Sequence, residues 1–307
     1  MLHIINTIVP VFAVILLGLV IRTTGYLPPE ITAPLNRLVY YIAIPAMIFK
    51  ALAKASFSAH FDLRLLAGTL LPVAIVFAVS AGLAALLRVP RGRRGTLVQS
   101  CFHGNLGYIG FAVVFYLLGE AGFTSASILA GFLMLLQNFL SVLTLELFSP
   151  DPPRGGKAVF VLRKIVANPV IVSAMAGIAF SLSGLALPLI GERTLAILSG
   201  MALPLALLVI GASLSPSQIR SNLKYALTSG AVKLLVLPAV GLAFYWAAGL
   251  DVDRFLPGLI LLASPTATIT YVMAAEMKGS VALASAAISL NTLLSALTFV
   301  FWLGILH

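Results

Sequence analysis

The sequence predicts an all-α polytopic membrane protein of ten transmembrane helices, arranged as two inverted repeats of five helices. Three observations predict this fold. The chain is 61% hydrophobic and only 9% charged, with a mean hydropathy of +1.10, which is more apolar surface than a soluble core can absorb. Apolar stretches long enough to cross a bilayer recur along its whole length. The two halves also share glycine and proline positions at a nearly constant offset.

Ten stretches are predicted to cross the membrane, because each offers the roughly 18–25 apolar residues that span the hydrocarbon core. The connections between them are short and leave no room for a soluble domain. The longest, residues 149–157, is rich in proline and glycine and lies at the middle of the chain. We therefore expect one integral membrane unit, with a first five-helix repeat over residues 1–150 and a second, inverted repeat over residues 151–307. The predicted spans are residues 4–22, 35–53, 65–88, 96–118, 124–148, 166–183, 191–214, 224–249, 255–276 and 281–306.

The second half repeats the first at residues that fix backbone geometry. Matches of glycine and proline are the most informative, because these residues set backbone dihedral angles rather than merely fill space. Five spans per repeat is an odd number, so the second repeat is expected to enter the membrane from the opposite side. At an offset of 159 residues the matches are Pro10 with Pro169, Gly18 with Gly177, Gly25 with Gly184, Pro29 with Pro188, Pro45 with Pro204 and Ser56 with Ser215, and at an offset of 161 Gly104 falls on Pro265 and Asn105 on Thr266.

The basic residues predict the orientation of the chain. A net charge of +10 would suggest nucleic acid as the partner of a soluble protein, but here most Lys and Arg lie in short gaps between apolar stretches, so no nucleic acid partner is expected. The N-terminus lacks the cationic region and cleavage site of a removable signal peptide, so the first span is expected to be retained. The charge bias places both termini in the extracytoplasmic space. The cytoplasmic connections then hold Arg22, Arg37, Arg88, Arg91, Arg93, Arg94, Arg154, Lys157, Arg163, Lys164, Arg220, Lys224 and Lys278, and the opposite connections hold only Lys54, Arg64, Arg193 and Arg254.

Polar and small residues interrupt the fourth and ninth predicted spans. The interruptions are residues 100–108 (SCFHGNLGY) and residues 263–271 (ASPTATITY). Backbone that leaves the helix at membrane depth is tolerated only where protein buries it or a cavity solvates it, so the two interruptions predict a site. The helical halves that follow, after Gly107 and from Pro265, are expected to direct their N-termini toward the bilayer midplane. Two helix N-termini favour a carboxylate or a similar anion.

The candidate binding residues lie at these two interruptions. We expect the side chains of Asn105, Thr266 and Thr268 to form hydrogen bonds to the anion, and Tyr108 and Tyr271 to line its cavity. In the alternative interpretation, Asn and Thr only satisfy carbonyl groups that are freed within their own helices. The predicted substrate-binding residues are Gly104, Asn105, Gly107, Tyr108, Pro265, Thr266, Thr268 and Tyr271.

A few charged or kinking residues lie within the predicted spans, and each is a functional candidate. Lys233 is predicted to neutralise a bound anion, to pair with a carboxylate, or to extend to the cytoplasmic interface. His103 is either the carrier of a coupling proton or a hydrogen-bonded structural histidine. Pro45 and Pro204 are either hinges that let a cavity open alternately or static kinks required for packing. Lys50, near the outer end of the second span, is predicted to extend to the interface.

Several further motifs follow one another along the chain, namely residues 35–39 (LNRLV) with Pro45, the Gly104-Asn105 interruption, Asn168-Pro169, Pro265 and residues 274–276 (AAE). In their order and spacing these motifs resemble the auxin efflux carrier family of secondary transporters. The resemblance covers nearly the whole chain, and the short central connection is similar to that of the bacterial branch, the malate or malonate permeases. It implies ten helices with the fourth and ninth broken and crossing at the substrate site, a plasma membrane location (the bacterial inner membrane), and a homodimer as in plant members. It also implies small organic anions as substrates, such as malate, malonate or auxin-like acids.

Two departures from the plant members limit what the resemblance implies. Plant carriers tend to have proline before the asparagine of the fourth-span interruption, where this chain has Gly104. They also place an acidic residue in the third span, in the region that Gly68 and Thr69 occupy here. An ion or proton role of that acid is therefore not expected in this chain.

The sequence thus predicts a secondary active transporter that moves small organic anions by alternating access, with no cofactor and no metal. Cys101 is the single cysteine, which excludes a cysteine-based metal cluster. The spans hold no paired aspartates and no His-Glu-x-x-His pattern, so an enzyme is not expected. One alternative is a transporter similar to sodium-coupled bile acid symporters, although the ninth-span interruption has no acid before Glu276. The other is a membrane sensor that binds a ligand without moving it.

Overall fold

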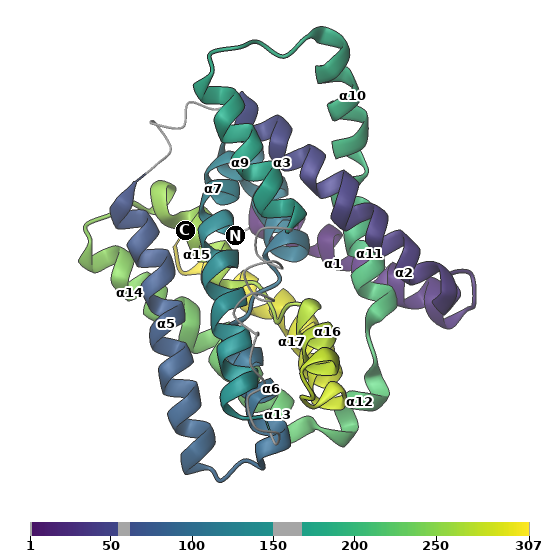
Figure 1. Cartoon of the computed structure of the whole chain (residues 1–307), viewed down its shortest axis with the longest axis vertical. Helices are drawn as coiled ribbons and strands as arrows, with labels where there is room; N and C mark the ends of the chain where they lie inside the picture. The colour runs from purple at the N-terminus through teal and green to yellow at the C-terminus, as the bar shows by residue number, and fades with distance from the viewer. Residues whose placement is uncertain (1, 55–61, 150–167, 307) are drawn as a thin grey trace.

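The structure, a computed structural model, describes residues 2–54, 62–149 and 168–306. Ser56, Arg154, Lys157, Arg163 and Lys164, which belong to the predicted repeat and charge pattern, lie outside the described residues. Every regular element in the described ranges is a helix, and an isolated antiparallel bridge joins Gly104 to Thr266. The helices (Figure 1) are α1 (Leu2–Thr23), α2 (Pro29–Leu38), η1 (Val39–Ala43), α3 (Ile44–Ala53), α5 (Leu63–Leu86), α6 (Arg91–Phe102), η2 (Leu106–Gly110), α7 (Phe111–Leu147), α9 (Pro169–Leu182), α10 (Leu189–Gly200), α11 (Ala202–Ser213), α12 (Pro216–Ser221), α13 (Leu223–Ala231), η3 (Val232–Val236), α14 (Leu237–Ala247), α15 (Val252–Ala263), α16 (Ile269–Glu276) and α17 (Val281–Gly304), where η marks a π-helical turn.

Membrane-length helices dominate the described part of the chain, which confirms the prediction of an all-α membrane protein. The stretch Leu106–Leu147 has 42 residues, and at about 1.5 Å per residue it is about twice as long as the hydrocarbon core is thick. Gly119, with φ of 67°, divides it into two helices at a kink, at the boundary expected between the fourth and fifth spans. The seven stretches long and apolar enough to cross a membrane are Leu2–Thr23, Glu30–Ala53, Leu63–Leu86, Leu106–Leu147, Leu189–Ser213, Leu223–Ala247 and Val281–Gly304.

Glycines bring two helices of one half into close contact with helices of the other half. A Cβ on Gly18 of α1 would lie 2.3 Å from the carbonyl oxygen of Leu208 on α11. A Cβ on Gly177 of α9 would lie 3.2 Å from the carbonyl oxygen of Phe49 on α3. Small residues allow such close approach of helices in membranes. Gly177 follows Gly18 by 159 residues, and Leu208 follows Phe49 by the same offset. The contact of α1 with α11 and the contact of α9 with α3 are therefore equivalent under the repeat, with the roles of the two halves exchanged.

The turns that end helices show the same correspondence. A residue in the left-handed region commonly ends a helix, and glycine adopts it at the lowest cost. Six such residues occur in the described chain, and they form three pairs at the offsets of 159 and 161 residues expected for the repeat. The pairs are Gly25 (φ 84°) with Gly184 (69°), Arg88 (50°) with Gly249 (65°), and Gly119 (67°) with Lys278 (58°).

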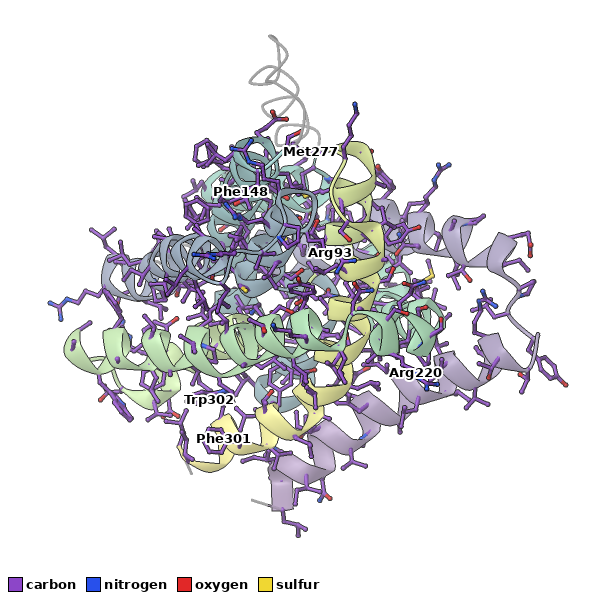
Figure 2. The ribbon with its side chains drawn as sticks, turned by 90° about the horizontal axis from the view of Figure 1, so that it is seen from below. Arg93, Phe148, Arg220, Met277, Phe301 and Trp302 are labelled. Atoms are coloured by element: carbon purple, nitrogen blue, oxygen red, sulfur yellow. The ribbon has the colours of Figure 1, made fainter. Side chains whose placement is uncertain are left out.

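One end of the molecule carries the basic start of α6. The Arg93 guanidinium lies 5.5 Å from the ring centroid of Tyr225, and the Arg94 guanidinium lies 5.4 Å from that of Phe148. Figure 2 views the molecule from this end and labels Arg93 and Phe148. Each guanidinium group thus lies over an aromatic ring, in the geometry of a cation–π contact. This is the end that the charge pattern predicts to be cytoplasmic.

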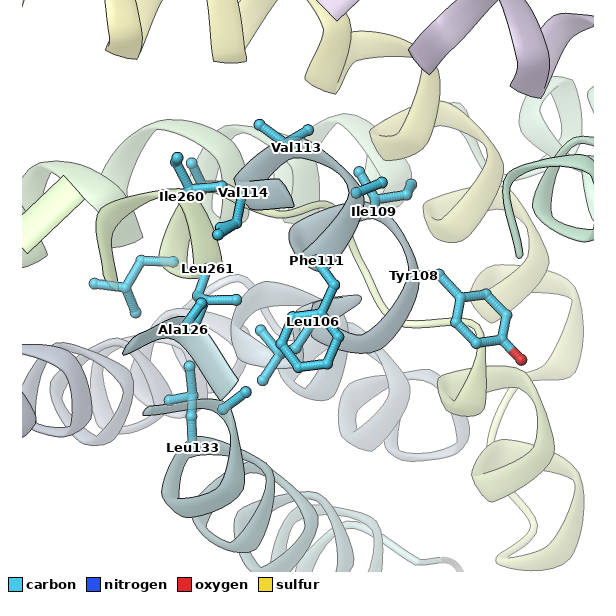
Figure 3. Close-up of a cluster of buried hydrophobic side chains, with 14 of the residues drawn as sticks. Leu106, Tyr108, Ile109, Phe111, Val113, Val114, Ala126, Leu133, Ile260 and Leu261 are labelled. Atoms are coloured by element: carbon cyan, nitrogen blue, oxygen red, sulfur yellow. The ribbon is translucent and has the colours of Figure 1, made fainter. Parts of the chain in front are cut away.

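The first helical turns after residue 105 are fixed in the apolar core. Leu106, Ile109 and Phe111 are almost fully buried, and Figure 3 shows them beside Leu133 of α7 and Leu261 of α15. A core of this density resists displacement of its side chains. The start of η2 is therefore held in place by packing as well as by hydrogen bonds.

Candidate functional site

The two interruptions predicted from the sequence meet and form backbone hydrogen bonds with each other. Helix α6 ends at Phe102 and α15 ends at Ala263, and the extended segments that follow run antiparallel. The Asn105 N–H donates to the Pro265 carbonyl oxygen at 2.7 Å, and the Ala267 N–H donates to the His103 carbonyl oxygen at 2.9 Å. Backbone groups freed at membrane depth thus satisfy one another, as burial away from water demands. We call this contact the crossing.

The second half of the ninth span begins later than the sequence predicted. Helix α16 starts at Ile269, with Thr268 as its N-cap, so the expectation of a helix from Pro265 is wrong. Ser264, directly before the proline, has extended dihedrals (φ −60°, ψ 143°), because a residue before proline is disfavoured in the helical region. Pro265 and Thr266 extend the strand-like segment that pairs with the first interruption, rather than open a helix.

A glutamine on α7 holds the first interruption. The Gln137 side chain donates to the carbonyl oxygen of Phe102 at 3.2 Å and accepts from the N–H of Gly104 at 3.2 Å. One amide thereby satisfies both an acceptor and a donor freed by the end of α6. A Cβ on Gly104 would lie 2.6 Å from the Ser264 hydroxyl oxygen. A side chain at residue 104 would have to displace this hydroxyl group, so the close approach of the two interruptions favours glycine there.

The His103 side chain is buried and hydrogen-bonded. Its Nδ1 lies 2.8 Å from the Ser141 hydroxyl oxygen on α7 and 3.4 Å from the Gln99 amide nitrogen. These contacts are those expected of the structural alternative. The role of His103 as carrier of a coupling proton stays a prediction.

At the second interruption, the Thr266 side chain is fully buried and engaged in protein contacts. Its hydroxyl group donates to the Ser100 carbonyl oxygen at 2.9 Å and accepts from the Asn291 amide nitrogen on α17 at 2.7 Å. This geometry is that of a residue that satisfies a freed carbonyl group. Thr268 is half-buried, and Tyr271 is 45% exposed. A role of these three side chains in anion binding stays a prediction.

Lys233 lies at the crossing, fully buried. Its ammonium group donates to the Leu262 carbonyl oxygen in the last turn of α15 at 2.6 Å. A Cβ on Gly104 would lie 3.3 Å from the Lys233 Cε, which places the lysine stem beside the first interruption as well. The alternative in which Lys233 extends to the cytoplasmic interface is therefore wrong. The π-helical turn η3 (Val232–Val236) carries this residue, and such turns are frequent at functional sites.

Two predicted residues at the first interruption differ in their hydrogen bonding. Asn105 is 5% exposed, and its Nδ2 group is buried with no partner among the described residues. Tyr108 points away from the apolar cluster of Figure 3 and donates from its hydroxyl group to Asn36 Oδ1 on α2 at 2.6 Å. Gly107 lies between them in the first turn of η2, where a Cβ would meet Met134 Cε at 3.7 Å. The Nδ2 group of Asn105 is thus a buried hydrogen-bond donor without a partner among the described residues.

The two predicted hinge prolines both lie where a long helix is interrupted. Pro45 follows η1 at the second residue of α3, and Pro204 is the third residue of α11, just after α10 ends. A proline removes a helical hydrogen bond and crowds the carbonyl four residues earlier, so interruptions at these places are expected. Whether the kinks move stays a prediction.

Sequence reasoning missed the side chains that support the crossing from neighbouring helices. Gln137, Ser141 and Asn291 are fully or almost fully buried, and Asn36 holds Tyr108. The signal was present, because a polar side chain in an apolar membrane helix usually faces the protein interior and pairs there.

Membrane-length apolar helices, together with two broken helices whose breaks bind each other, define a multi-pass membrane protein. Broken helices of this kind are typical of transporters, in which irregular backbone lines the substrate site.

Comparison with known proteins gives the family. A family model described as "Membrane transport protein" matches residues 3–158 and 157–303. The chain therefore belongs to this membrane transport protein family, the auxin efflux carrier family that its sequence resembles. It is a transporter rather than an enzyme.

Similar proteins cover nearly the whole chain. An "Uncharacterized transporter" of Methanothermobacter thermautotrophicus is 26% identical over 97% of this chain and 96% of the relative. A "Putative malonate transporter" of Rhizobium meliloti is 26% identical over 97% of this chain and 94% of the relative. "Auxin efflux carrier component 3a" of Oryza sativa subsp. japonica is 31% identical over 45% of this chain and 23% of the relative.

Proposed function

We propose that this transporter is a secondary active carrier of small organic anions, and that the anion binds at the crossing. The observation that carries the proposal is the buried ammonium group of Lys233 beside the first interruption. No carboxylate pairs with Lys233 among the residues that the structure describes. A buried charge without a counter-ion is costly, and a bound carboxylate would supply that counter-ion.

The backbone at the crossing adds to this preference for anions. Leu106 and Ile269 begin helical segments, and the positive end of each helix dipole lies at these starts. Part of the first N–H groups is already paired, because those of Leu106, Thr270 and Tyr271 donate to carbonyl oxygens just before or at the helix start. Each helix N-terminus stabilises a nearby negative charge by about 0.3–2 kcal/mol. The unpaired Asn105 amide is a further donor. We therefore assign anion binding to Asn105, Lys233 and the first turns of η2 and α16, and keep Gly104, Gly107, Tyr108, Pro265, Thr266, Thr268 and Tyr271 as the residues that shape the site.

The overall architecture that fits this carrier has ten transmembrane helices. In it, α6 with the start of α7 is the fourth and α15 with α16 is the ninth, and the halves 1–150 and 151–307 form inverted repeats that exchange access between the two sides. The exchanged glycine contacts and the paired left-handed turns support this arrangement. The basic residues favour both termini outside the cytoplasm in the plasma membrane.

The substrate class that we propose is small carboxylates. The relative named for malonate covers nearly the whole chain, and the site offers one lysine rather than a set of arginines. Sodium coupling, the alternative mechanism, needs oxygen ligands. The ninth-span interruption offers hydroxyl groups, and that of Thr266 already binds Ser100 and Asn291.

Counterflow in proteoliposomes tests the proposal. Purified protein is reconstituted with internal malonate, malate, succinate or lactate, and uptake of the same radiolabelled acid is measured with and without sodium. We expect saturable exchange of at least one acid that is independent of sodium, is lost in Asn105→Ala and is retained in Asn138→Ala, an equivalent change on α7. Absence of exchange for every acid in the wild type would contradict carboxylate transport. Unchanged affinity in a correctly inserted Asn105→Ala protein would contradict the binding role.

A further inference from the structure

A cavity lies away from the crossing, where α3, α7, α10 and α11 meet. Its volume is about 460 Å³, within the usual range for small-molecule sites. Its lining is mostly apolar and includes Phe115, Tyr116 and Pro204, together with the side chains of Lys50 and Lys54. Tyr116, in the cavity, is eight residues after Tyr108 of the crossing, which places it roughly 12 Å further along the helix axis. None of the residues of the crossing lines this cavity.

The charges in the cavity leave one ammonium group weakly compensated. Lys54 forms a close ion pair with Glu192 of α10. Lys50 is one turn earlier on the same face of α3, and its nearest carboxylate oxygen, on Glu120, lies at 3.8 Å. The Lys50 side chain is 25% exposed, whereas that of Glu120 is 83% exposed. An exposed, loosely held carboxylate contributes little to a pair and is easily displaced.

We propose that this cavity is a second anion site, which binds a monocarboxylate with an apolar body by pairing its carboxylate with Lys50. When the site is empty, the Glu120 carboxylate lies beside the Lys50 ammonium group. When the ligand enters, the Glu120 side chain turns toward solvent. The aromatic and aliphatic lining receives the apolar body, while Lys54 stays paired with Glu192. The inference rests on the proposed function for the chemical class of the ligand and for the side of the membrane that the cavity faces, whereas its residues are separate from the crossing.

The cavity is at the end of the molecule away from Arg93 and Arg94. It borders the C-terminal end of α3, which lies in the upper part of Figure 1, and the junction between the end of α10 and the start of α11, whereas α6 begins at the bottom. On the orientation proposed above, the site faces the extracytoplasmic side. It would therefore sample the anions that approach or leave the carrier there. Pro204 lines the cavity and lies where α10 ends and α11 begins, so a ligand in the cavity would contact the interruption between these two helices.

Fluorine NMR of 4-fluorophenylacetate tests this site without requiring flux. The protein is held in lipid nanodiscs in the Asn105→Ala background, so that the crossing does not contribute, and broadening of the ligand signal gives a dissociation constant. Lys50→Gln should weaken binding about tenfold or more, because a charge-assisted contact is lost. Glu120→Gln should strengthen it by about 1.4- to fivefold, because an exposed competing carboxylate is removed. Lys50→Arg should restore most of the affinity.

Arg193→Gln is the matched control, because it removes a cation from the same end that does not line the cavity. Binding that survives Lys50→Gln, or that weakens in Glu120→Gln, would overturn the proposal. Binding lost in the Asn105→Ala background but present in the wild type would place the ligand at the crossing and also overturn it. Counterflow of the Asn105→Ala protein reports separately on the proposed function, so the two failures are distinguishable.

Discussion

The buried lysine at the crossing gives the sharpest test of anion binding. Lys233→Met keeps the length of the side chain and removes the charge. At an anion concentration about 100 times the dissociation constant, the wild-type protein should gain about 2.7 kcal/mol of stability from binding. The contact between a carboxylate and the Lys233 ammonium group is worth about 2 kcal/mol, so the variant should bind about 30 times more weakly. At the same anion concentration its gain falls to about 0.9 kcal/mol.

The assay is the thermal unfolding midpoint of purified protein, measured with and without the acid found active in counterflow. Only the difference between the two conditions is compared, because Lys233→Met also removes the donor to the Leu262 carbonyl oxygen and so changes the stability of the empty protein. Lys224→Met is the matched control, since Lys224 is exposed at the start of the helix that leads into η3. An anion-induced shift in Lys233→Met as large as that of the wild type would refute the role of the lysine.

Two further predictions concern stability rather than binding. Gly177→Ala should lower the unfolding midpoint, because its Cβ would lie 2.9 Å from that of a leucine on α3 and overpacking typically costs about 1–3 kcal/mol. Gly131→Ala, with open space around the added methyl group, should be neutral or stabilising, and an equal loss in both variants would contradict the packing argument. Gln137→Leu should destabilise the protein by about 2–6 kcal/mol, because it leaves the Phe102 carbonyl and the Gly104 N–H buried without a partner. A similar loss in Asn138→Leu, one residue away, would show that the effect is not specific to the crossing.

The sequence predicted where the chain breaks but not how the breaks are held. Glycine, asparagine and proline within apolar stretches located both interruptions, since non-helical backbone in a membrane needs residues that permit it. The offset between the halves predicted that the interruptions correspond. Their antiparallel pairing through Asn105 and Ala267 could not be predicted, because register depends on how the helices around the two interruptions pack, among them α15 against η2 and α7. The same pairing moved the start of α16 from Pro265 to Ile269.

The direction of buried polar side chains was the other limit. Lys233 could have extended toward the interface, and the sequence left that alternative open. Its orientation is decided by η3, where the wider π-helical turn precedes Pro238. Proline at that position leaves the Leu234 carbonyl without a helical donor, and the Trp302 indole N–H supplies one at 2.7 Å. Such a network spans residues far apart in the chain, so no local pattern reveals it.

The left-handed turns explain why the repeat is more visible in the backbone than in the sequence. Gly25 and Gly184 match in both, but the turns at Arg88 and Lys278 correspond to Gly249 and Gly119. A left-handed conformation costs a residue other than glycine about 1–2 kcal/mol, so a basic residue there needs a reason. If the halves are inverted, corresponding turns lie at opposite ends of the molecule. Only one member of each pair then lies at the cytoplasmic end, where basic residues are favoured because they set the orientation of a membrane protein. A basic residue at one end and glycine at the other is then the expected outcome, whereas halves that run in the same direction would place the same demand on both members.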